Sequence, residues 1–523
     1  MKKPLKNIFA ILFLSVFLSL SLWSITTKSA TFDEVQYFGV GKYLMQNQRW
    51  DVMGAILHPP LSYYLNSIPL LFVQEDKRLW EYDVPVRDLD FLGAVDYYRG
   101  QELLSSLDNK NDRLLIASRA LFTLLSLFTG FYVYRYSTLL YGSNGGLLSL
   151  LLFSFCPNML AYAGLILPDM PLTLYTLATA YHLTISLRDN RISGWILSGL
   201  CAGLALLSKF TALLLLPAFM LLTLFFLLRN KGGFNPRLLI VPAVALFTLL
   251  IGYGFNLTPY FQGLTYQLAH AADGHSSFLF GQYSISGWWY YYPLVFMLKS
   301  PLPLLVIFAA SIYLLIRKQL VGWPKQLFLL LPIVLLFTIF SIKHQSIGIR
   351  YILPVYPFIF VLAGSLTCLN GLWRPGLYCL LAWYVIGTLY SAPHFLAYFN
   401  ESVGGSANGY KYLVDSNLDW GQDLKGLKKY MDRNGVQRIS LSYFGADSPQ
   451  RYGINYDWLP SHHLYNPKAD EPLQLKQNQL LAISATNLQG VYFDNKAQYY
   501  WLFDYQPIAK IGHSIFIYDL NGR

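Results

Sequence analysis

The sequence predicts a polytopic α-helical membrane protein with a small mixed domain at its C-terminal end. Hydrophobic residues make up 54% of the 523 residues and charged residues only 13%, against roughly 25% charged residues in a typical soluble domain. Apolar runs long enough to cross a bilayer recur along the chain. After residue 392 the composition changes, and Asp, Asn, Gln, Lys and Tyr become frequent. These observations predict a membrane domain over residues 1–392 and an extramembrane domain over 393–523.

The first apolar run covers residues 8–25 and follows Lys2, Lys3 and Lys6. This arrangement also fits a cleaved signal peptide, but the many later runs favour an uncleaved first helix. In total the sequence predicts about eleven membrane-spanning helices of about 20 residues each. The further spans are expected near residues 114–137, 146–162, 170–187, 193–208, 211–228, 238–257, 291–316, 327–342, 354–369 and 376–392.

The basic residues indicate how the chain is oriented. The formal net charge is +11, but Lys and Arg lie in short turns between apolar runs and form no patch of the kind that binds nucleic acid. With a cytoplasmic N-terminus, most of these cations fall on the inner side, as the positive-inside rule requires. The short outer turns then hold only Lys209, Lys343 and Arg350. Three larger segments face outward, over residues 26–113, 258–290 and 393–523.

The C-terminal segment alternates strand-like and helix-like runs. Strands are expected at 439–444, 480–483 and 514–518, and a helix at 424–432. The sequence therefore predicts a small α/β or α+β domain outside the membrane. The four cysteines of the chain lie in or beside apolar runs without metal-ligand spacing, so we interpret them as small apolar residues.

The first outer segment contains two adjacent carboxylates at a predicted helix start. Thr31 and Glu34 have the spacing of a capping box, and residues 35–46 have the apolar pattern of an amphipathic helix lying on the membrane. Asp33 falls in the first turn, where the helix dipole stabilises the ionised carboxylate. A charged base there suits removal of a proton from a hydroxyl nucleophile. The alternative is that both carboxylates only cap the helix.

Two further motifs lie at predicted helix starts on the same side. His58 precedes Pro59 and Pro60, which favour the start of a helix over residues 61–73, and the imidazole is placed to contact a phosphate or hydroxyl. Asp169, between Pro168 and Pro171, begins the fourth span. It is either a helix cap or a residue beside the substrate.

The outer cations are the strongest indication of a ligand. Lys209, Lys343 and Arg350, the last followed by Tyr351, together suit a phosphate or pyrophosphate; the alternative is that they reach lipid headgroups. The aromatic run at 288–292 is typical of an interfacial belt. No phosphate-binding loop, dinucleotide fingerprint or zinc-protease helix is present in the sequence, so a nucleotide-linked substrate is unsupported.

Together these motifs resemble glycosyltransferase family 39, which includes the protein O-mannosyltransferases and the lipid A aminoarabinose transferases. The resemblance is carried by Asp33-Glu34-Val35, His58-Pro59-Pro60-Leu61, Asp169-x-Pro171, Lys209 and Arg350-Tyr351-x-Leu353-Pro354, and by the tail segment 415–423. It covers about residues 1–392. The chain departs from the protein O-mannosyltransferases in having no β-trefoil insertion in an outer loop, which puts a protein acceptor in doubt.

The resemblance implies a GT-C fold, a polyprenyl-phosphate sugar donor and inversion at the anomeric carbon. It makes Asp33 the base and gives Glu34 a role in positioning substrate at the catalytic site. It also implies that Lys209 and Arg350 hold the phosphate and that His58 supports them. Asp169, Lys343 and Tyr351 complete the predicted substrate-binding set. No cofactor is expected, and a divalent metal stays open.

We therefore expect an integral membrane glycosyltransferase that acts on a lipid, glycan or protein hydroxyl at the extracytoplasmic face of a plasma membrane. Three alternatives remain at this stage. An oligosaccharide polymerase or ligase requires a pyrophosphate-linked donor. A transporter or flippase of a lipid-linked sugar is expected to show inverted repeats and midplane charges. A non-catalytic assembly protein does not require Asp33.

Overall fold

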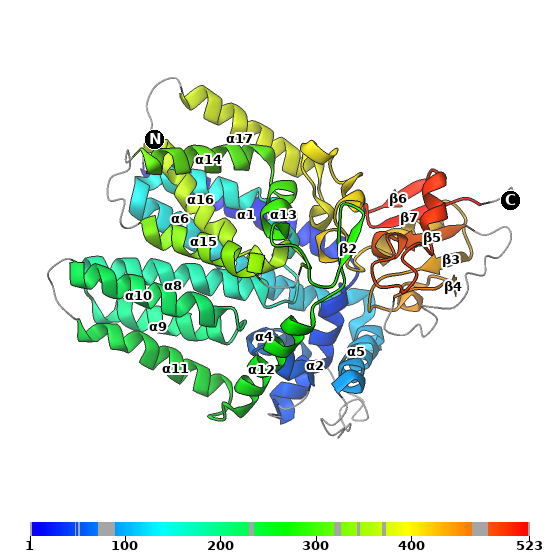
Figure 1. The fold of residues 1–523 in the computed structure, drawn as a ribbon, viewed down its shortest axis with the longest axis horizontal. Helices are drawn as coiled ribbons and strands as arrows, with labels where there is room; N and C mark the ends of the chain where they lie inside the picture. Colours follow the sequence, from blue (N-terminus) through cyan, green and yellow to red (C-terminus); the bar gives the residue numbers. More distant parts are fainter. Residues whose placement is uncertain are drawn as a thin grey trace.

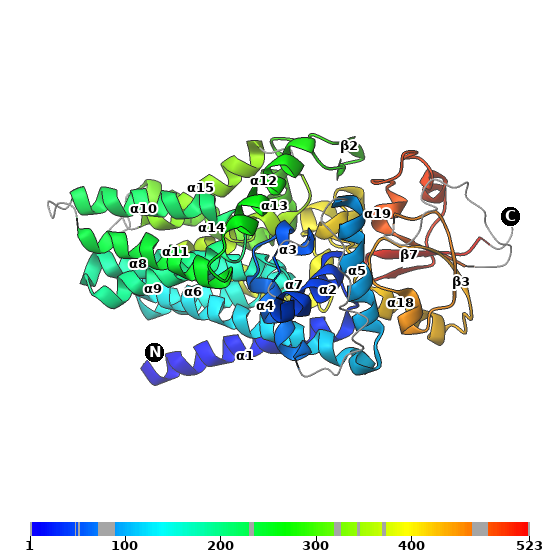
Figure 2. The ribbon, with the colours of Figure 1, turned by 90° about the horizontal axis from the view of Figure 1, so that it is seen from below.

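The computed structural model describes residues 3–47, 49–50, 53–71, 89–229, 235–317, 326–342, 346–368, 373–462 and 480–520. A helical bundle occupies one end of the long axis and a β-sheet the other, and the chain starts at the bundle end and finishes beyond the sheet (Figure 1). A layer of short helices, α2 to α5, lies between these two parts (Figure 2). The molecule is thus mostly helical with a small C-terminal sheet domain, as the sequence predicts.

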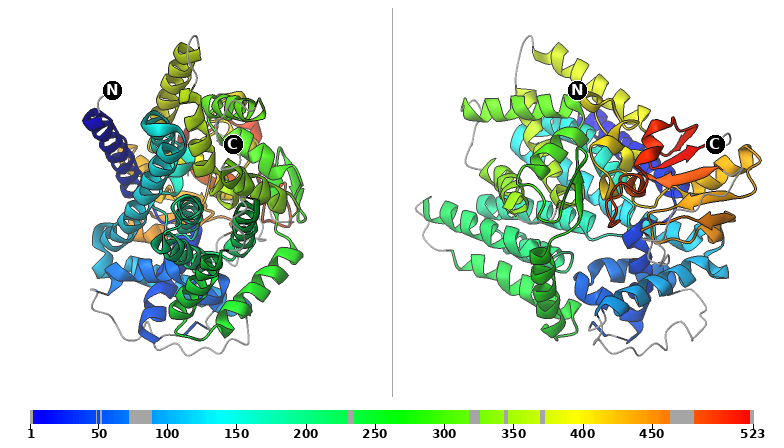
Figure 3. Two further views of the ribbon diagram at one scale, coloured as in Figure 1. Left: turned by 90° about the vertical axis from the view of Figure 1, so that its left-hand side faces the viewer. Right: turned by 45° about the vertical axis from the view of Figure 1, so that its right-hand side comes forward.

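The bundle is built from apolar helices. Three described helices are long and apolar enough to cross a membrane, over residues 5–27, 113–154 and 212–229, and a bent pair supplies a fourth candidate. α1 packs against α6 at the edge of the bundle (Figure 3). The helices are α1 (Lys3–Thr27), α6 (Arg113–Ser154), α7 (Pro157–Tyr162), α8 (Asp169–Asp189), α9 (Ile192–Leu206), α10 (Ala212–Arg229), α11 (Ile240–Gly252), α13 (Tyr291–Lys299), α14 (Leu302–Ile316), α15 (Leu327–Ile342), α16 (Val355–Ala363) and α17 (Trp373–Tyr390).

The predicted spans differ in detail from the structure at two places. The predicted spans 114–137 and 146–162 correspond to the two parts of α6, which is interrupted at Gly142, where the backbone is not helical (φ +77°); the second part ends at Ser154, and residues 157–162 form α7. The single span predicted over 291–316 is two helices, α13 and α14, which meet at 118°. Pro301 lies at this break, and a proline cannot continue the helical hydrogen bonding of the residues before it. The number of spans, about eleven on the hydropathy criterion, stays a prediction.

The layer between bundle and sheet contains α2 (Phe32–Asn47), α3 (Met53–Leu57), α4 (Leu61–Leu70) and α5 (Leu89–Ser105). α2 packs between α4 and α5, and the prediction that residues 35–46 lie on the membrane surface stays a prediction. The crossing with α5 is close: a Cβ on Gly39 would lie 1.9 Å from the Asp96 carbonyl oxygen, and one on Gly100 would lie 1.8 Å from that of Val35. The apolar pattern of α2 therefore serves protein packing.

The second outer segment forms α12 (Thr258–Asp273) and a hairpin of β1 (Ser277–Leu279) and β2 (Gln282–Ser284). The strands pair antiparallel, with Ser277 opposite Ser284. Phe280 and Gly281 connect them with φ of +50° and +78°, the backbone that a tight two-residue hairpin turn requires.

The C-terminal domain contains a five-stranded sheet in the order β4-β3-β5-β7-β6. β3 pairs parallel with β4 and β5, whereas β7 pairs antiparallel with β5 and β6. α18 covers the sheet with Leu424, Leu427 and Met431 buried. The predicted strands and helix are all present. Their bounds are α18 (Leu424–Arg433), β3 (Ile439–Ser442), β4 (Tyr456–Trp458), β5 (Leu481–Ser484), α19 (Ala485–Leu488), β6 (Ala509–Ile511) and β7 (Ile515–Tyr518).

Candidate active site

The predicted base lies in an ion pair at the end of the bundle that faces the sheet. Asp33 is in the first turn of α2, and Arg350 is in a short 3-10 helix, η5 (Ile349–Ile352). The Arg350 Nη1 lies 2.7 Å from the Asp33 Oδ2, and the two side chains are 13% and 24% exposed. The pair is therefore partly open to its surroundings.

A second ion pair brings together two more of the predicted residues. Asp169 starts α8, and Lys209 lies in the turn between α9 and α10. The Lys209 Nζ is 2.7 Å from the Asp169 Oδ1, and both side chains are at most 10% exposed. The Tyr351 ring connects the two pairs, with its centroid 4.5 Å from the Lys209 Nζ and 5.4 Å from the Arg350 guanidinium carbon. Residues far apart in the sequence thus form one cluster of charge.

Several polar atoms of this cluster have spare hydrogen-bonding capacity. Among the described residues, the Arg350 Nε, the Asp169 Oδ2 and the His58 Nδ1 are buried without a hydrogen-bond partner. Buried polar groups are normally paired, so these atoms are suited to contact a bound ligand. Burial, reinforced by the charges of Lys209 and Arg350, holds the pKa of His58 well below its usual value. The His58 imidazole is therefore neutral at neutral pH.

Glu34, the second predicted catalytic residue, lies outside this cluster, and its contacts favour the alternative of a helix cap. Its side chain is fully buried. The Oε2 accepts hydrogen bonds from the Thr31 backbone N–H at 2.8 Å and the Thr31 hydroxyl at 3.0 Å, so the predicted capping contact is present. The Oε1 accepts from the Ile166 N–H at 3.2 Å. These contacts, completed by an arginine, occupy both carboxylate oxygens and make Glu34 a residue that fixes the start of α2.

The arginine that pairs with Glu34 is Arg119 of α6, which the sequence analysis missed. Its Nε donates to the Glu34 Oε1 at 2.9 Å and its Nη2 to the Oε2 at 2.5 Å. The remaining N–H groups donate to the carbonyl oxygens of Ile25, Lys28 and Ser29 at the end of α1. An ionisable residue inside an apolar run is a signal of a specific role. Arg119 lies inside the run 114–137, whereas the positive-inside rule is applied to cations in the turns between runs.

The C-terminal domain also contributes to the site. The Trp420 ring centroid lies 4.5 Å from the Arg350 guanidinium carbon. The Trp420 carbonyl oxygen accepts a hydrogen bond from the Phe32 N–H at 2.9 Å, directly beside Asp33. Sequence reasoning identified the 415–423 segment only as part of a resemblance, because its contacts depend on folding over hundreds of residues.

Three further predictions concern Lys343, the aromatic run at 288–292 and a divalent metal. Lys343 lies outside the described residues. The aromatic run divides: Trp289 is 73% exposed, as expected of an interfacial belt, whereas Tyr291 and Tyr292 are buried. Within the described part of the chain, no cluster of three or more His, Cys, Asp or Glu side chains is arranged to hold a metal ion.

An apolar cavity of about 380 Å³ lies among α8, α9, α10, α11 and α12. Leu206 and Leu213, which flank the turn that carries Lys209, both line it, together with Phe219, Tyr260 and Phe261. The backbone N–H of Leu61, just after the His-Pro-Pro motif, donates to the Leu207 carbonyl oxygen at 3.0 Å. The same turn thus contacts the cavity on one side and carries the cation of the polar cluster.

One protein-family model matches part of the chain. The family model of dolichyl-phosphate-mannose-protein mannosyltransferases matches residues 103–252. No curated protein matches the chain.

Three solved structures align with this chain at low sequence identity. ArnT from Cupriavidus metallidurans bound to undecaprenyl phosphate is 14% identical with a TM-score of 0.49, over 97% of this chain and 97% of that chain. The S. cerevisiae Pmt1-Pmt2 protein O-mannosyltransferase complex is 17% identical with a TM-score of 0.32, over 52% of this chain and 34% of that chain. The archaeal oligosaccharyltransferase AglB from Archaeoglobus fulgidus is 11% identical with a TM-score of 0.40, over 72% and 55%.

The family match includes Asp169 and Lys209 and lies in the membrane bundle that holds one half of the charged cluster. It agrees with the resemblance drawn from the sequence motifs: over residues 103–252 the chain is similar to the dolichyl-phosphate-mannose-protein mannosyltransferases.

Proposed function

We propose that this chain transfers one sugar from a polyprenyl-phosphate donor to a hydroxyl acceptor on the extracytoplasmic side of the membrane, with inversion. One observation carries the proposal: a partly open carboxylate, Asp33, lies in a cluster with two cations, and Leu206 and Leu213, close to Lys209 in the chain, line an apolar cavity. The matching family is described by a lipid-phosphate mannose donor, and the acceptor class is argued from the base.

The two cations are suited to a single phosphate. Lys209 and Arg350 both contact the Tyr351 ring, and Arg350 offers a buried Nε that has no partner among the described residues. Guanidinium and ammonium groups form charge-assisted hydrogen bonds to phosphate oxygens. Because Leu206 and Leu213 on either side of Lys209 line the cavity, a lipid tail attached to this phosphate enters the cavity directly.

The chemistry is a single displacement. The acceptor hydroxyl oxygen forms a bond to the anomeric carbon, and Asp33 takes the hydroxyl proton. The bond between that carbon and the donor phosphate oxygen breaks, and the electron pair leaves with the phosphate, which the cations stabilise. Attack on the face opposite the leaving group inverts the anomeric centre.

Binding of the donor also prepares the base. In the structure the Arg350 Nη1 lies 2.7 Å from the Asp33 Oδ2. The guanidinium that would bind the donor phosphate is therefore paired with the base. A donor phosphate competes for this guanidinium and releases an Asp33 oxygen toward the acceptor. His58, neutral because its pKa is lowered by burial and the two cations, offers an uncharged hydrogen bond to the donor.

The proposed orientation has a cytoplasmic N-terminus and an extracytoplasmic sheet domain in a plasma membrane. The first residues of α1 and the sheet domain lie at opposite ends of the bundle (Figure 1). The charged cluster lies at the sheet end, because Trp420 of the C-terminal domain contacts Arg350. Chemistry on that side uses a lipid-linked donor, since nucleotide sugars are not supplied there.

The test uses membranes that contain the wild-type chain or the Asp33→Asn variant, a panel of polyprenyl-phosphate sugars and polyprenyl-pyrophosphate glycans, and extracted envelope acceptors. Mass spectrometry follows each donor and each acceptor. We expect one donor to be consumed with a matching gain in acceptor mass, and this transfer to be absent with Asp33→Asn. Equal consumption by the variant would remove Asp33 from the mechanism. Consumption of only pyrophosphate-linked glycans would favour a polymerase or ligase, and lipid movement without bond cleavage a flippase.

A further inference from the structure

We infer that the 415–423 segment sets the separation of Asp33 and Arg350, and that Trp420 and Asn417 are positioning residues for the transfer. This inference rests on the proposed function, because it assigns roles around the same base and the same cation. The segment lies in the C-terminal domain just before α18 and holds both partners of the ion pair by separate contacts.

One set of contacts holds the backbone that carries Arg350. The Asn417 Oδ1 accepts a hydrogen bond from the Ile349 N–H at 3.0 Å, and its Nδ2 donates to the Ile347 carbonyl oxygen at 3.1 Å. The same Nδ2 contacts the Tyr291 hydroxyl at 3.0 Å. Gly348 permits this approach, since a Cβ there would lie 2.3 Å from the Ser416 hydroxyl oxygen. Asn417 therefore fixes the residues on both sides of Gly348, immediately before Arg350.

A second set of contacts holds the backbone that carries Asp33. The Trp420 carbonyl oxygen accepts from the Phe32 N–H at 2.9 Å, and the Gln422 carbonyl oxygen accepts from the Ser29 N–H at 2.9 Å. The Ser29 hydroxyl donates to the Gly421 carbonyl oxygen at 3.0 Å. Residues on both sides of the α2 start are thus joined to the segment, so a displacement of the segment moves Asp33 relative to Arg350.

The Trp420 ring acts on the guanidinium itself. The ring lies 4.5 Å from the Arg350 guanidinium carbon, and Trp420 is 2% exposed. A cation over a buried indole is attracted by the ring face without losing its charge. When the donor phosphate displaces Asp33 from Arg350, this contact remains and keeps the guanidinium in place. Trp420 is therefore placed to orient the cation in the state that reacts.

The 415–423 segment is held in place by further contacts to the helical bundle. The Lys299 Nζ donates to the Asn417 carbonyl oxygen at 2.5 Å, and the Tyr162 hydroxyl donates to the Ser416 carbonyl oxygen at 2.9 Å. The Asp423 carboxylate pairs with Lys28 at 2.5 Å, with both side chains at most 9% exposed.

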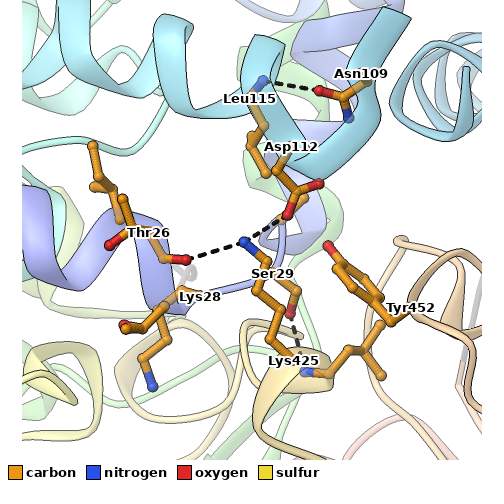
Figure 4. Close-up of polar contacts among 12 residues, drawn as sticks. Thr26, Lys28, Ser29, Asn109, Asp112, Leu115, Lys425 and Tyr452 are labelled. Carbon is orange, nitrogen blue, oxygen red and sulfur yellow. Dashed lines mark hydrogen bonds and ion pairs between the residues drawn. The ribbon is translucent and has the colours of Figure 1, made fainter. Parts of the chain in front are cut away.

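The helix that follows the segment is docked on the bundle as well. The Lys425 Nζ reaches the Asp112 Oδ2 at 2.5 Å and the Thr26 carbonyl oxygen at 3.2 Å (Figure 4). Lys425 belongs to α18, Thr26 to the end of α1, and Asp112 immediately precedes α6. The sheet domain is therefore a structural part of the active site.

The experiment compares Trp420→Leu with Trp420→Phe in the full-length chain in detergent. The leucine removes the aromatic face, the phenylalanine keeps it, and the carbonyl bond to Phe32 is unaffected by either. Trp458→Leu, on β4, is the control for loss of a tryptophan in the same domain. The measurements are kcat, KM for the donor, thermal unfolding, and binding of undecaprenyl phosphate alone.

We expect Trp420→Leu to lower kcat/KM about tenfold, in the range of a desolvated cation–π contact, with an unfolding temperature close to wild type. Trp420→Phe should recover most of the loss, and Trp458→Leu should match wild type. Equal activities of the leucine and phenylalanine variants would overturn the inference. So would loss of folded protein in both, which would make Trp420 a packing residue.

Binding of undecaprenyl phosphate separates this inference from the proposed function. If the wild-type chain transfers no sugar from any donor, the proposed function fails. If it still binds undecaprenyl phosphate, and binding is weaker in Trp420→Leu and restored in Trp420→Phe, the positioning of Arg350 by Trp420 stands. Equal binding by all variants would overturn the positioning role whatever the activity.

Discussion

Two neighbouring carboxylates of α2 each pair with an arginine, and the two pairs differ in almost every physical respect. Glu34 and Arg119 are both fully buried, and all the N–H groups of Arg119 are engaged by Glu34 and by three carbonyl oxygens. Asp33 and Arg350 are 24% and 13% exposed, and the Arg350 Nε has no partner among the described residues. One pair is saturated, whereas the other retains capacity for a ligand.

The difference follows from helix geometry and has a functional consequence. Consecutive residues of an α-helix point about 100° apart, so adjacent carboxylates at its start face different surroundings. Glu34 faces the interior, where a charge requires complete pairing. Asp33 faces the cluster, where its arginine is also available to a phosphate. A saturated pair fixes structure, and an unsaturated pair can exchange partners during a reaction.

The largest effect is expected from breaking the saturated pair. Arg119→Met leaves the Glu34 carboxylate buried without its partner, a change that costs about 3–5 kcal/mol. We expect little folded protein after detergent extraction, measured by size-exclusion chromatography and thermal unfolding. The double variant Arg119→Met with Glu34→Gln should recover part of the folded yield. An Arg119→Met variant as stable as wild type would show that the pair does not hold α1, α2 and α6 together.

Breaking the unsaturated pair should instead affect the donor. Arg350→Ala removes one phosphate ligand, and we expect a loss of about 2 kcal/mol, which is roughly a 30-fold rise in KM for the donor. The unfolding temperature should change far less than in Arg119→Met, because Asp33 is open enough to be solvated. Steady-state kinetics with the donor identified above measures this. Unchanged donor dependence would mean that Arg350 serves a lipid headgroup.

The Asp169–Lys209 pair tests whether the other cation of the cluster also binds the donor. Replacing both residues, Asp169→Asn with Lys209→Gln, removes a cation without leaving a buried carboxylate unpaired. We expect near wild-type stability and about a tenfold rise in KM for the donor, the effect of one lost charge-assisted contact. Undecaprenyl phosphate binding provides an independent measurement. If the double variant binds the phosphate as tightly as wild type, Lys209 only neutralises Asp169.

Sequence reasoning located the open pair better than the saturated one. Lys209 and Arg350 are predictable because each is a charge in a short outer turn beside an apolar run, and Asp33 and Asp169 because each is a carboxylate at a predicted helix start. Arg119 escaped because its partner lies 85 residues away, and no local pattern records such a pairing. Geometry alone separates Asp33 from Glu34, since both satisfy the same helix-start rule.

The fold shows the same division between local and long-range information. The strands and helix of the tail follow from alternation and composition, and the apolar runs are helices. The burial of α2 could not be predicted, because an apolar pattern does not tell whether lipid or protein covers it. Pro301 is a local signal of the bend between α13 and α14. Hydropathy does not report it, because both sides of the proline are apolar.

A third carboxylate, Asp419, tests the comparison through pH, because it is buried without an arginine. The Asp419 Oδ2 accepts a hydrogen bond from the Thr486 N–H at 2.8 Å, and burial raises the pKa of Asp419 to about 8. The folded chain then carries this group protonated at neutral pH, while the unfolded chain ionises it above its ordinary pKa of about 4. The folded state binds the extra proton, so this group makes stability fall as pH rises from about 4 to about 8.

Asp419→Asn keeps the shape and removes the titration. The variant should unfold at the same temperature as wild type near pH 4, at a higher temperature at pH 8, and the gap should stop growing above that pH. Thermal unfolding across this range measures it, with the exposed Asp432→Asn as the control. A gap that does not depend on pH would mean that Asp419 is ionised in the folded chain. In that case a buried carboxylate of this protein stays ionised without an arginine. Charge pairing would then not explain why Glu34 and Asp33 behave differently, and only the directions of their side chains would.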